Sequence, residues 1–148
     1  MGQKTLLITG GTGYIGSHAV VAFEQAGYKT VIIDNLSNSS RKSLDGIQKI
    51  LWYTPDFYEC DICDQIGLKN IFEKYSFDGV IHFAGLKAVG ESCEEVGLYH
   101  SNNVWGSITL FWVMQEFWVH KIVFSSSATV YSPDNISPLR ADPPLAET

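Results

Sequence analysis

Cysteine is scarce in this sequence, and no long hydrophobic run is present. The 148 residues include three cysteines. This number is small and odd, so the cysteines cannot form a disulfide framework. No stretch approaches the roughly 20 consecutive apolar residues that span a bilayer, and the amino-terminal residues do not resemble a signal peptide. We therefore expect no membrane attachment, a reducing compartment and, by default, a cytoplasmic location.

Basic residues are also in short supply. Ten Lys and Arg face sixteen Asp and Glu, which gives a net charge of -6. This balance argues against a nucleic acid or an anionic membrane as partner, because such partners are held by clusters of positive charge. Hydrophobic residues make up 45% of the chain, which is too many for a disordered protein. One globular domain that binds a small molecule is the expectation.

The spacing of the cysteines does not indicate a metal site. Cys60 and Cys63 form a C-x-x-C pair, but no second Cys or His pair lies at the spacing that would complete four zinc ligands. We expect neither a metal nor a redox role for them.

Short apolar runs alternate with helical patterns along the chain. The runs predict strands over residues 5–9, 28–33, 57–60, 79–83 and 121–124. The helical patterns cover residues 14–26, 43–50, 65–75 and 98–118, and Asp64 is a plausible N-cap of the third helix. Because parallel strands need crossover helices, this alternation predicts an α/β fold, a Rossmann-type doubly wound parallel sheet covered on both faces.

The pattern ends after Tyr131. Prolines and polar residues follow it, and no further strand or helix fits the sequence. We therefore expect an incomplete nucleotide-binding domain over residues 1–131 and a Pro-rich irregular tail over residues 132–148.

Three glycines at the first strand-to-helix junction favour a dinucleotide ligand. Gly10, Gly13 and Gly16 are spaced three apart. In such a loop one glycine permits the turn, one lets the backbone approach a diphosphate, and one lets helix and strand pack closely. The helix amino terminus adds free N–H groups and a positive dipole. Glycine-rich turns are common, so the spacing is weak evidence by itself.

An acidic residue at the end of the next strand strengthens this interpretation. Asp34 ends the second strand, near the ~20-residue separation at which a carboxylate reaches the adenosine ribose. Because a carboxylate repels a 2′-phosphate, NAD is favoured over NADP, and Arg41 and Lys42 are expected to be solvated surface. Asp61 follows the third strand, where an adenine contact and a turn or cap are equally good interpretations.

Four segments carry a resemblance to a known family. Residues 9–18, 34–39, 82–92 and 124–131 resemble the UDP-glucose 4-epimerase family of the extended short-chain dehydrogenase/reductase superfamily. The glycine loop is shared by the whole superfamily, whereas the 82–92 block is nearly diagnostic of the epimerase family. The resemblance implies a tightly held NAD that takes hydride from C4 of a UDP-hexose and returns it to the other face. UDP-glucose and UDP-galactose would interconvert, as in galactose metabolism.

The resemblance also implies which residues line the cofactor, all of them at or beyond strand ends. These are Gly10, Gly13, Tyr14, Ile15, Gly16, Asp34, Asn35, Leu36, Ser37, Asn38, Ser39, Asp61, Ile62, Phe83, Ala84, Gly85, Leu86, Lys87 and Asn102. Ser127 would be catalytic, with its hydroxyl on the hexose 4-hydroxyl. Lys87 would place a cation near the cofactor and raise its hydride affinity.

The catalytic inventory expected from the resemblance is incomplete. A serine hydroxyl alone is a poor base, and the family supplies the base as a Tyr-x-x-x-Lys pair. No tyrosine in this sequence is followed by Lys at that spacing, and we expect the C-terminal substrate domain, which would bind the UDP moiety, to be absent. We expect the cofactor-binding portion of an epimerase, with little or no turnover alone.

Two other interpretations stay open. One is a non-catalytic dinucleotide-binding module that associates with another chain, and the other is a nucleotide-sugar dehydratase or reductase of the same superfamily. Trp105, Trp112 and Trp118 make one predicted helix unusually bulky, and we expect these rings to pack rather than to bind ligand. In the family that helix helps to form a homodimer, so Trp112 and Trp118 are candidates for a subunit surface.

Overall fold

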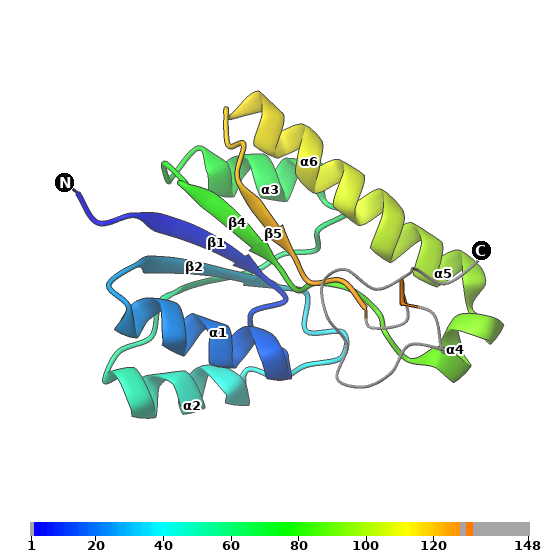
Figure 1. The fold of residues 1–148 in the computed structure, drawn as a ribbon, viewed down its shortest axis with the longest axis horizontal. Coiled ribbons are helices and arrows are strands. Elements are labelled where there is room, and N and C mark those ends of the chain that lie inside the picture. Colours follow the sequence, from blue (N-terminus) through cyan, green and yellow to red (C-terminus); the bar gives the residue numbers. More distant parts are fainter. Residues whose placement is uncertain (1, 128–129, 132–148) are drawn as a thin grey trace.

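The fold is a five-stranded parallel sheet between two layers of helices (Figure 1). The computed structural model describes residues 2–127, 130 and 131. The strands are β1 (Thr5–Thr9), β2 (Lys29–Asp34), β3 (Asp56–Glu59), β4 (Gly79–His82) and β5 (Ile122–Phe124). Their order in the sheet is β3-β2-β1-β4-β5, and every neighbouring pair is parallel. The predicted α/β doubly wound sheet is confirmed, with strand ends that differ by one residue at most.

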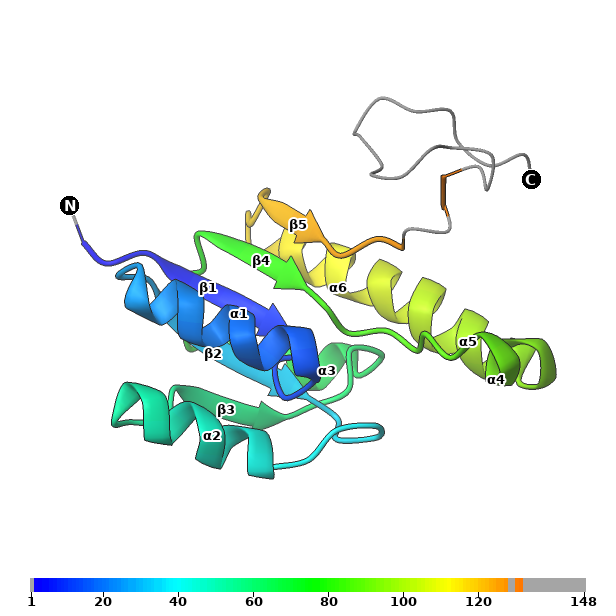
Figure 2. The same cartoon turned by 60° about the horizontal axis from the view of Figure 1, so that its bottom comes forward.

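The two faces of the sheet carry separate apolar cores. Side chains alternate between faces along a strand, so Leu7 and Val80 pack against α3 (Gln65–Phe72) and α6 (Gly106–Glu116). Ile8 and Ile32 pack on the other face against α1 (Tyr14–Gln25) and α2 (Lys42–Leu51). Figure 2 shows these two helix pairs on opposite sides of the strands. Burial on both faces explains why the central strands read as continuous apolar runs.

Two predicted helix ends are confirmed, each with a physical cause. Gly27 follows α1 with φ +89, a left-handed conformation that glycine adopts readily. Asp64 caps α3, because its side chain accepts a hydrogen bond from the Gly67 N–H. Trp52 and Trp118 follow α2 and α6 with left-handed φ values of 67° and 58°. Their side chains are 90% and 81% exposed.

The predicted helical stretch over residues 98–118 is present, but it is not one regular helix. Helical structure begins earlier, with α4 (Val89–Glu94) and α5 (Val96–His100), and continues through a π-helical turn, η1 (Ser101–Trp105), into α6. α4 buries no residue. A helix without a buried face does not need the apolar periodicity from which helices are predicted. The third helix also ends at Phe72, earlier than predicted.

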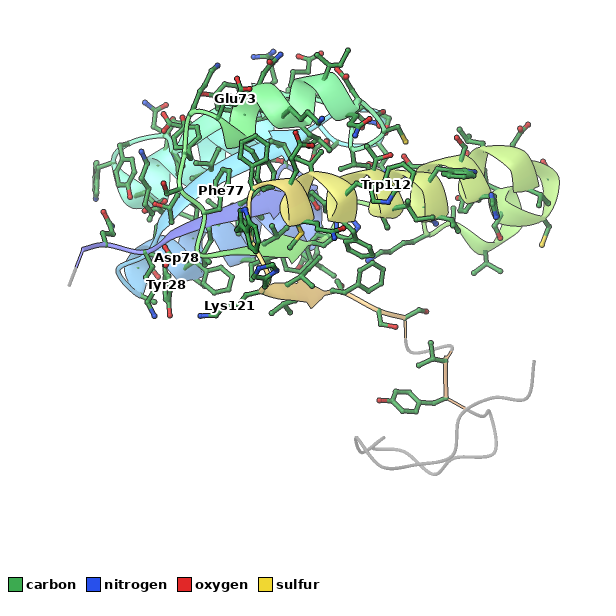
Figure 3. All side chains as sticks on the ribbon, turned by 90° about the horizontal axis from the view of Figure 1, so that it is seen from above. Tyr28, Glu73, Phe77, Asp78, Trp112 and Lys121 are labelled. Atoms are coloured by element: carbon green, nitrogen blue, oxygen red, sulfur yellow. The ribbon has the colours of Figure 1, made fainter. Side chains whose placement is uncertain are left out.

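The aromatic residues of this region lie partly at the surface. Trp105 and Trp112 are each about half exposed, and Figure 3 labels Trp112 on α6. No helix in the described part of the chain has the length and apolar character needed to cross a membrane. The predicted tail over residues 132–148 lies outside the described residues.

Candidate functional site

A cavity of about 390 Å³ lies at the carboxyl ends of the central strands. The chain leaves β1 toward β2 on one side, whereas β4 flanks β1 on the other side. Ligands of open parallel sheets bind where the strand order reverses in this way. The lining residues are Gly10, Gly13, Tyr14, Ile15, Gly16, Ile33, Asp34, Asn35, Ser37, Asn38, Cys60, Ile62, Phe83, Ala84, Gly85, Leu86, Lys87, Ala88 and Asn102.

Two glycines make the close packing at this site possible. Gly10 has φ +66, and a Cβ there would lie 2.7 Å from the Ala84 backbone nitrogen. A Cβ on Gly16 would lie 2.1 Å from the Gly10 carbonyl oxygen. A side chain at either position would therefore push α1 or the segment after β4 away from β1. The surroundings of Gly10 and Gly16 agree with the tight turn and the close helix–strand contact that the sequence predicts.

The amino end of α1 faces the cavity. Gly13, Tyr14, Ile15 and Gly16 line it, and the first turn of α1 contains no acidic residue. N–H groups of a first helical turn have no acceptor within their own helix, and the helix dipole adds positive potential there. Gly13 is the N-cap and supplies no capping side chain. This end of the cavity is therefore suited to an anion such as a diphosphate.

Asp34 is buried at the end of β2 and organises the adjoining loops. Its carboxylate accepts hydrogen bonds from the Thr12 N–H (3.1 Å), the Leu36 N–H (2.9 Å) and the Ser39 hydroxyl (2.9 Å). Leu36 takes a left-handed backbone conformation, φ 59°. Asp34 lines the cavity, whereas Leu36 and Ser39 do not. Those two predicted residues lie behind the site and hold Asp34 in place.

Asp61 caps the turn after β3. Its carboxylate accepts hydrogen bonds from the Asn35 side chain (2.7 Å) and the Cys63 N–H (2.8 Å). Partial burial raises the pKa of Asp61, but these hydrogen bonds outweigh it and hold the pKa below its ordinary value. Asp61 does not line the cavity, whereas Cys60 and Ile62 do. The sequence spacing left an adenine contact and a turn or cap open for Asp61, and the hydrogen bond from the Cys63 N–H is that of a turn.

The two cysteines after β3 keep their protons. Burial, followed by nearby acidic groups, raises the pKa of both the Cys60 and the Cys63 thiol to about 11. Neither thiol is therefore a thiolate near neutral pH, which is the reactive form. Across the described residues, no group of three or more His, Cys, Asp or Glu side chains is arranged to hold a metal ion.

Arg41 is less free than the sequence suggested. Its guanidinium pairs with Glu59 at 2.5 Å and lies 5.2 Å from the Phe57 ring centroid. It is thereby tethered to β3, although its side chain remains mostly exposed. Lys42 is exposed, as expected.

The segment after β4 forms the opposite wall of the cavity. Residues 83–88 and Asn102 of η1 line it, and Lys87 is exposed. Sequence reasoning missed Ile33, Cys60 and Ala88, which line the cavity beside predicted residues. Each of the three is adjacent in sequence to a predicted site residue, and this adjacency was the signal that could have identified them.

Ser127 lies beyond β5 and does not line this cavity. It is exposed, and its backbone carbonyl accepts a hydrogen bond from the Val130 N–H at 3.3 Å. The cofactor residues and the proposed catalytic serine are therefore not gathered around one cavity among the described residues.

Comparison with known proteins identifies related chains. The family whose profile matches is the NAD dependent epimerase/dehydratase family, over residues 6–147. UDP-glucose 4-epimerase of Yersinia enterocolitica is 52% identical over 135 residues, which cover 91% of this chain and 40% of that protein. UDP-glucose 4-epimerase 2 of Arabidopsis thaliana is 45% identical over 148 residues, 98% of this chain and 42% of that protein.

Solved structures give the same relationship. UDP-glucose-4-epimerase of Stenotrophomonas maltophila, with bound NAD and formylated UDP-arabinopyranose, matches with a TM-score of 0.92 and 40% identity. It covers 97% of this chain, which in turn covers 43% of that one. The enzyme of Bifidobacterium longum, in complex with NAD+ and UDP, matches with a TM-score of 0.92, 38% identity, and coverages of 98% and 43%. The chain thus spans about two fifths of the length of these relatives.

Proposed function

The chain belongs to the NAD dependent epimerase/dehydratase family, and from that membership we propose that it is the NAD-binding portion of a UDP-glucose 4-epimerase. The observation that carries the proposal is the cavity at the strand-order reversal, with the anion-suited end of α1 on one side and Asp34 on another. The relatives that share half or nearly half of its residues are UDP-glucose 4-epimerases.

The residues around the cavity fit a dinucleotide. The amino end of α1 would hold the diphosphate, and Gly16 keeps that end close to β1. One oxygen of Asp34 accepts a single protein hydrogen bond, so it retains capacity for a ribose hydroxyl. Asn35, Ser37, Asn38 and Ile62 would surround the adenosine, and the 83–88 wall with Asn102 would flank the rest. NAD, when bound, would accept and return the hydride at C4 of the sugar.

Asp34 and Arg41 together favour NAD over NADP. The carboxylate of Asp34 would face the ribose hydroxyls and repel a 2′-phosphate. Arg41, one of the two cations that follow Asp34 along the chain, is paired with Glu59 instead.

The remaining roles concern the whole enzyme. Ser127 would hydrogen-bond the hexose 4-hydroxyl, and Lys87 would place its charge beside the cofactor and strengthen hydride acceptance. The substrate would be a UDP-hexose, the setting galactose metabolism in the cytoplasm, and the assembly a homodimer. The base for proton transfer would come from outside these 148 residues, because no Tyr-x-x-x-Lys pair is present.

Calorimetric titration of the purified chain with NAD and with NADP tests the proposal. We expect NAD to bind at least tenfold more tightly than NADP, and UDP-galactose to show no epimerisation by the chain alone. An Asp34→Ala variant should lose affinity for NAD, whereas Asp45→Ala, an exposed change on α2, should not. Well-folded protein that takes up no NAD would refute the proposal. Robust epimerisation would refute the expectation of inactivity.

A further inference from the structure

The 83–88 wall leaves the sheet, yet its backbone polar groups keep partners. The Ala84 N–H donates to the Thr9 hydroxyl (3.3 Å), and the Ala88 N–H donates to the Tyr99 hydroxyl (3.1 Å). Between them, the Leu86 N–H donates to the Asn103 side chain. Three side chains from β1, α5 and η1 thus replace the neighbouring strand that this segment no longer has.

Asn103 makes the most specific of these contacts. Its Oδ1 accepts from the Leu86 N–H at 2.8 Å, and its Nδ2 donates to the Leu86 carbonyl at 2.9 Å. A side-chain amide is among the few groups that can serve a backbone donor and a backbone acceptor at once. Oδ1 also accepts from the Asn102 side chain at 2.9 Å. Asn103 does not line the cavity itself, whereas Leu86 and Asn102 do.

A buried polar chain holds Asn103 from behind. The Ser107 hydroxyl donates to the Asn103 carbonyl at 2.6 Å. Because the single hydroxyl proton of Ser107 is used in this bond, the contact of 3.1 Å between Ser107 Oγ and His82 Nε2 has the histidine nitrogen as donor. His82 Nδ1 then accepts from the Thr9 hydroxyl at 2.6 Å. His82 is 1% exposed, so each of its nitrogens needs such a partner.

The polar chain therefore begins and ends at the cavity wall. It runs from the Ala84 N–H through Thr9, His82 and Ser107 to the Asn103 backbone, and the Asn103 side chain returns to Leu86. Hydrogen bonds that all point one way along such a chain reinforce each other. The chain is complete with His82 neutral and its proton on Nε2.

We propose that Asn103 and His82 are positioning residues, which fix the 83–88 wall and with it Lys87 against the dinucleotide site through this hydrogen-bonded chain. The proposal rests on the proposed function of the cavity. Neither residue touches the cavity volume, and both act through the backbone of residues that do.

Hydrogen exchange at the Leu86 amide tests the clamp without any ligand. The purified 148-residue chain is measured by NMR as wild type, Asn103→Ala and Asn103→Asp. We expect Asn103→Ala to lower the Leu86 protection factor at least tenfold at every pH, because both hydrogen bonds are lost. Asn103→Asp should lower it less, because a carboxylate oxygen can still accept from the Leu86 N–H while the donor to the Leu86 carbonyl is lost.

Binding of NAD by the same variants tests the positioning role. We expect the affinity for NAD to fall about tenfold in Asn103→Ala and by a smaller factor in Asn103→Asp, in the same order as the loss of Leu86 protection. Asn70→Asp places the same change on an exposed residue of α3 and should behave as wild type. Affinity that is unchanged in Asn103→Ala, or that falls without any loss of Leu86 protection, would overturn the proposal.

The role of His82 has its own readout. Imidazole nitrogen shifts should report the Nε2–H form in wild type at pH 7 and a mixture of both neutral forms in Ser107→Ala, with severalfold lower Leu86 protection. Unchanged protection in Ser107→Ala would remove His82 and Ser107 from the proposal. If wild type binds no NAD, the proposed function fails, whereas the exchange experiment still decides whether the clamp exists.

Discussion

Gly16 lies where the first turn of α1 passes over the loop that follows β1. A Cβ at this position would meet backbone, the Gly10 carbonyl oxygen at 2.1 Å, rather than a side chain that could move. The contact that brings helix and strand together is therefore incompatible with any other residue. The tight packing in turn keeps the first-turn N–H groups of α1 at the cavity.

Gly16→Ala should lower the free energy of unfolding by about 1–3 kcal/mol, the usual cost of overpacking. Gly46→Ala is the matched control, because Gly46 lies inside α2 with nothing within 4 Å of its added Cβ. It should leave stability unchanged or raise it by up to about 1 kcal/mol. Urea unfolding followed by far-UV circular dichroism measures both. Equal stability of the two variants would contradict the steric argument.

His82 should make stability depend on pH. Burial, and after it the charge of Lys87, lowers the pKa of His82 from 6.5 to about 4. Between these two pH values the unfolded chain binds a proton at His82 that the folded chain does not bind. The free energy of unfolding should therefore fall as pH drops through this window, by up to roughly 3 kcal/mol.

Unfolding measured between pH 7 and 5 checks this expectation. His82→Gln should show a shallower dependence on pH than wild type, whatever its overall stability. His120→Gln replaces an exposed histidine and should keep the wild-type dependence. Identical slopes in all three proteins would show that His82 titrates in the folded protein as it does in the unfolded chain.

At the scale of residues, the sequence was informative wherever one residue type is obligatory. Gly10 and Gly16 could be placed because the turn and the close contact exclude side chains. The supporting role of Ser39 could not be separated from a lining role, because both lie in the same short loop. Asn103 was invisible for a different reason: its partner Leu86 is distant in sequence, and contacts between distant residues leave no local pattern.

Among the elements, α3 shows how a short helix is fixed at its start. The Asp64 side chain accepts a hydrogen bond from the Gly67 N–H at 3.0 Å, which satisfies one donor that the helix itself cannot. α3 has only eight residues, so one capping hydrogen bond is a large share of the hydrogen bonds that hold it. The packing of α3 against α6 depends on the helix beginning there.

Asp64→Ala should lower the free energy of unfolding by about 1 kcal/mol, a typical value for loss of an N-cap. Asn70→Ala, an exposed change on the same helix, should shift it by less than about 0.5 kcal/mol. Thermal unfolding by circular dichroism compares the two variants. A loss in Asn70→Ala as large as that in Asp64→Ala would assign the effect to helix propensity instead of capping.

Helices were predictable where one face is buried and a cap or glycine marks the end. α1 meets both conditions, and its ends were placed within one residue. α2 has the buried face but neither a side-chain cap nor a glycine at its ends, and its ends were also placed within one residue. The stretch from α4 to α6 does not meet these conditions, because α4 buries nothing and η1 has a wider turn than the periodicity assumes. The π-helical turn has no sequence signature, yet it places Asn102 at the cavity and Asn103 at the wall.

In the molecule as a whole, the sheet ends at β5 on the side away from β3. Val123 and Phe124 of β5 are both more than half exposed. Among the described residues β5 pairs only with β4, so its other edge presents backbone groups that can pair with another strand. The chain alone should therefore self-associate through this edge at high concentration.

Val123→Lys should raise the concentration at which the chain associates by severalfold, because a charged edge strand pairs poorly. Ile66→Lys adds the same charge to an exposed apolar position on α3, away from the edge. It should change association much less. Sedimentation velocity over a range of concentrations compares the variants. An equal effect of both would point to net charge rather than to the strand edge.

The parallel sheet followed from the sequence because every strand is separated from the next by helical structure. The strand order did not follow, because a crossover to either side of β1 preserves the same alternation. The order places β4 beside β1, and only this neighbourhood brings Ala84 against Gly10 and closes the cavity. The homodimer stays a prediction.

The positions of the tryptophans have a practical consequence for spectroscopy. All four of them, Trp52, Trp105, Trp112 and Trp118, are at least half exposed in the folded chain. Their indole emission should already lie near the wavelength of fully hydrated tryptophan, and it should shift little when the chain unfolds. Intrinsic fluorescence would then under-report folding transitions in this protein, whereas a tryptophan introduced at the buried Phe72 would give the missing optical signal.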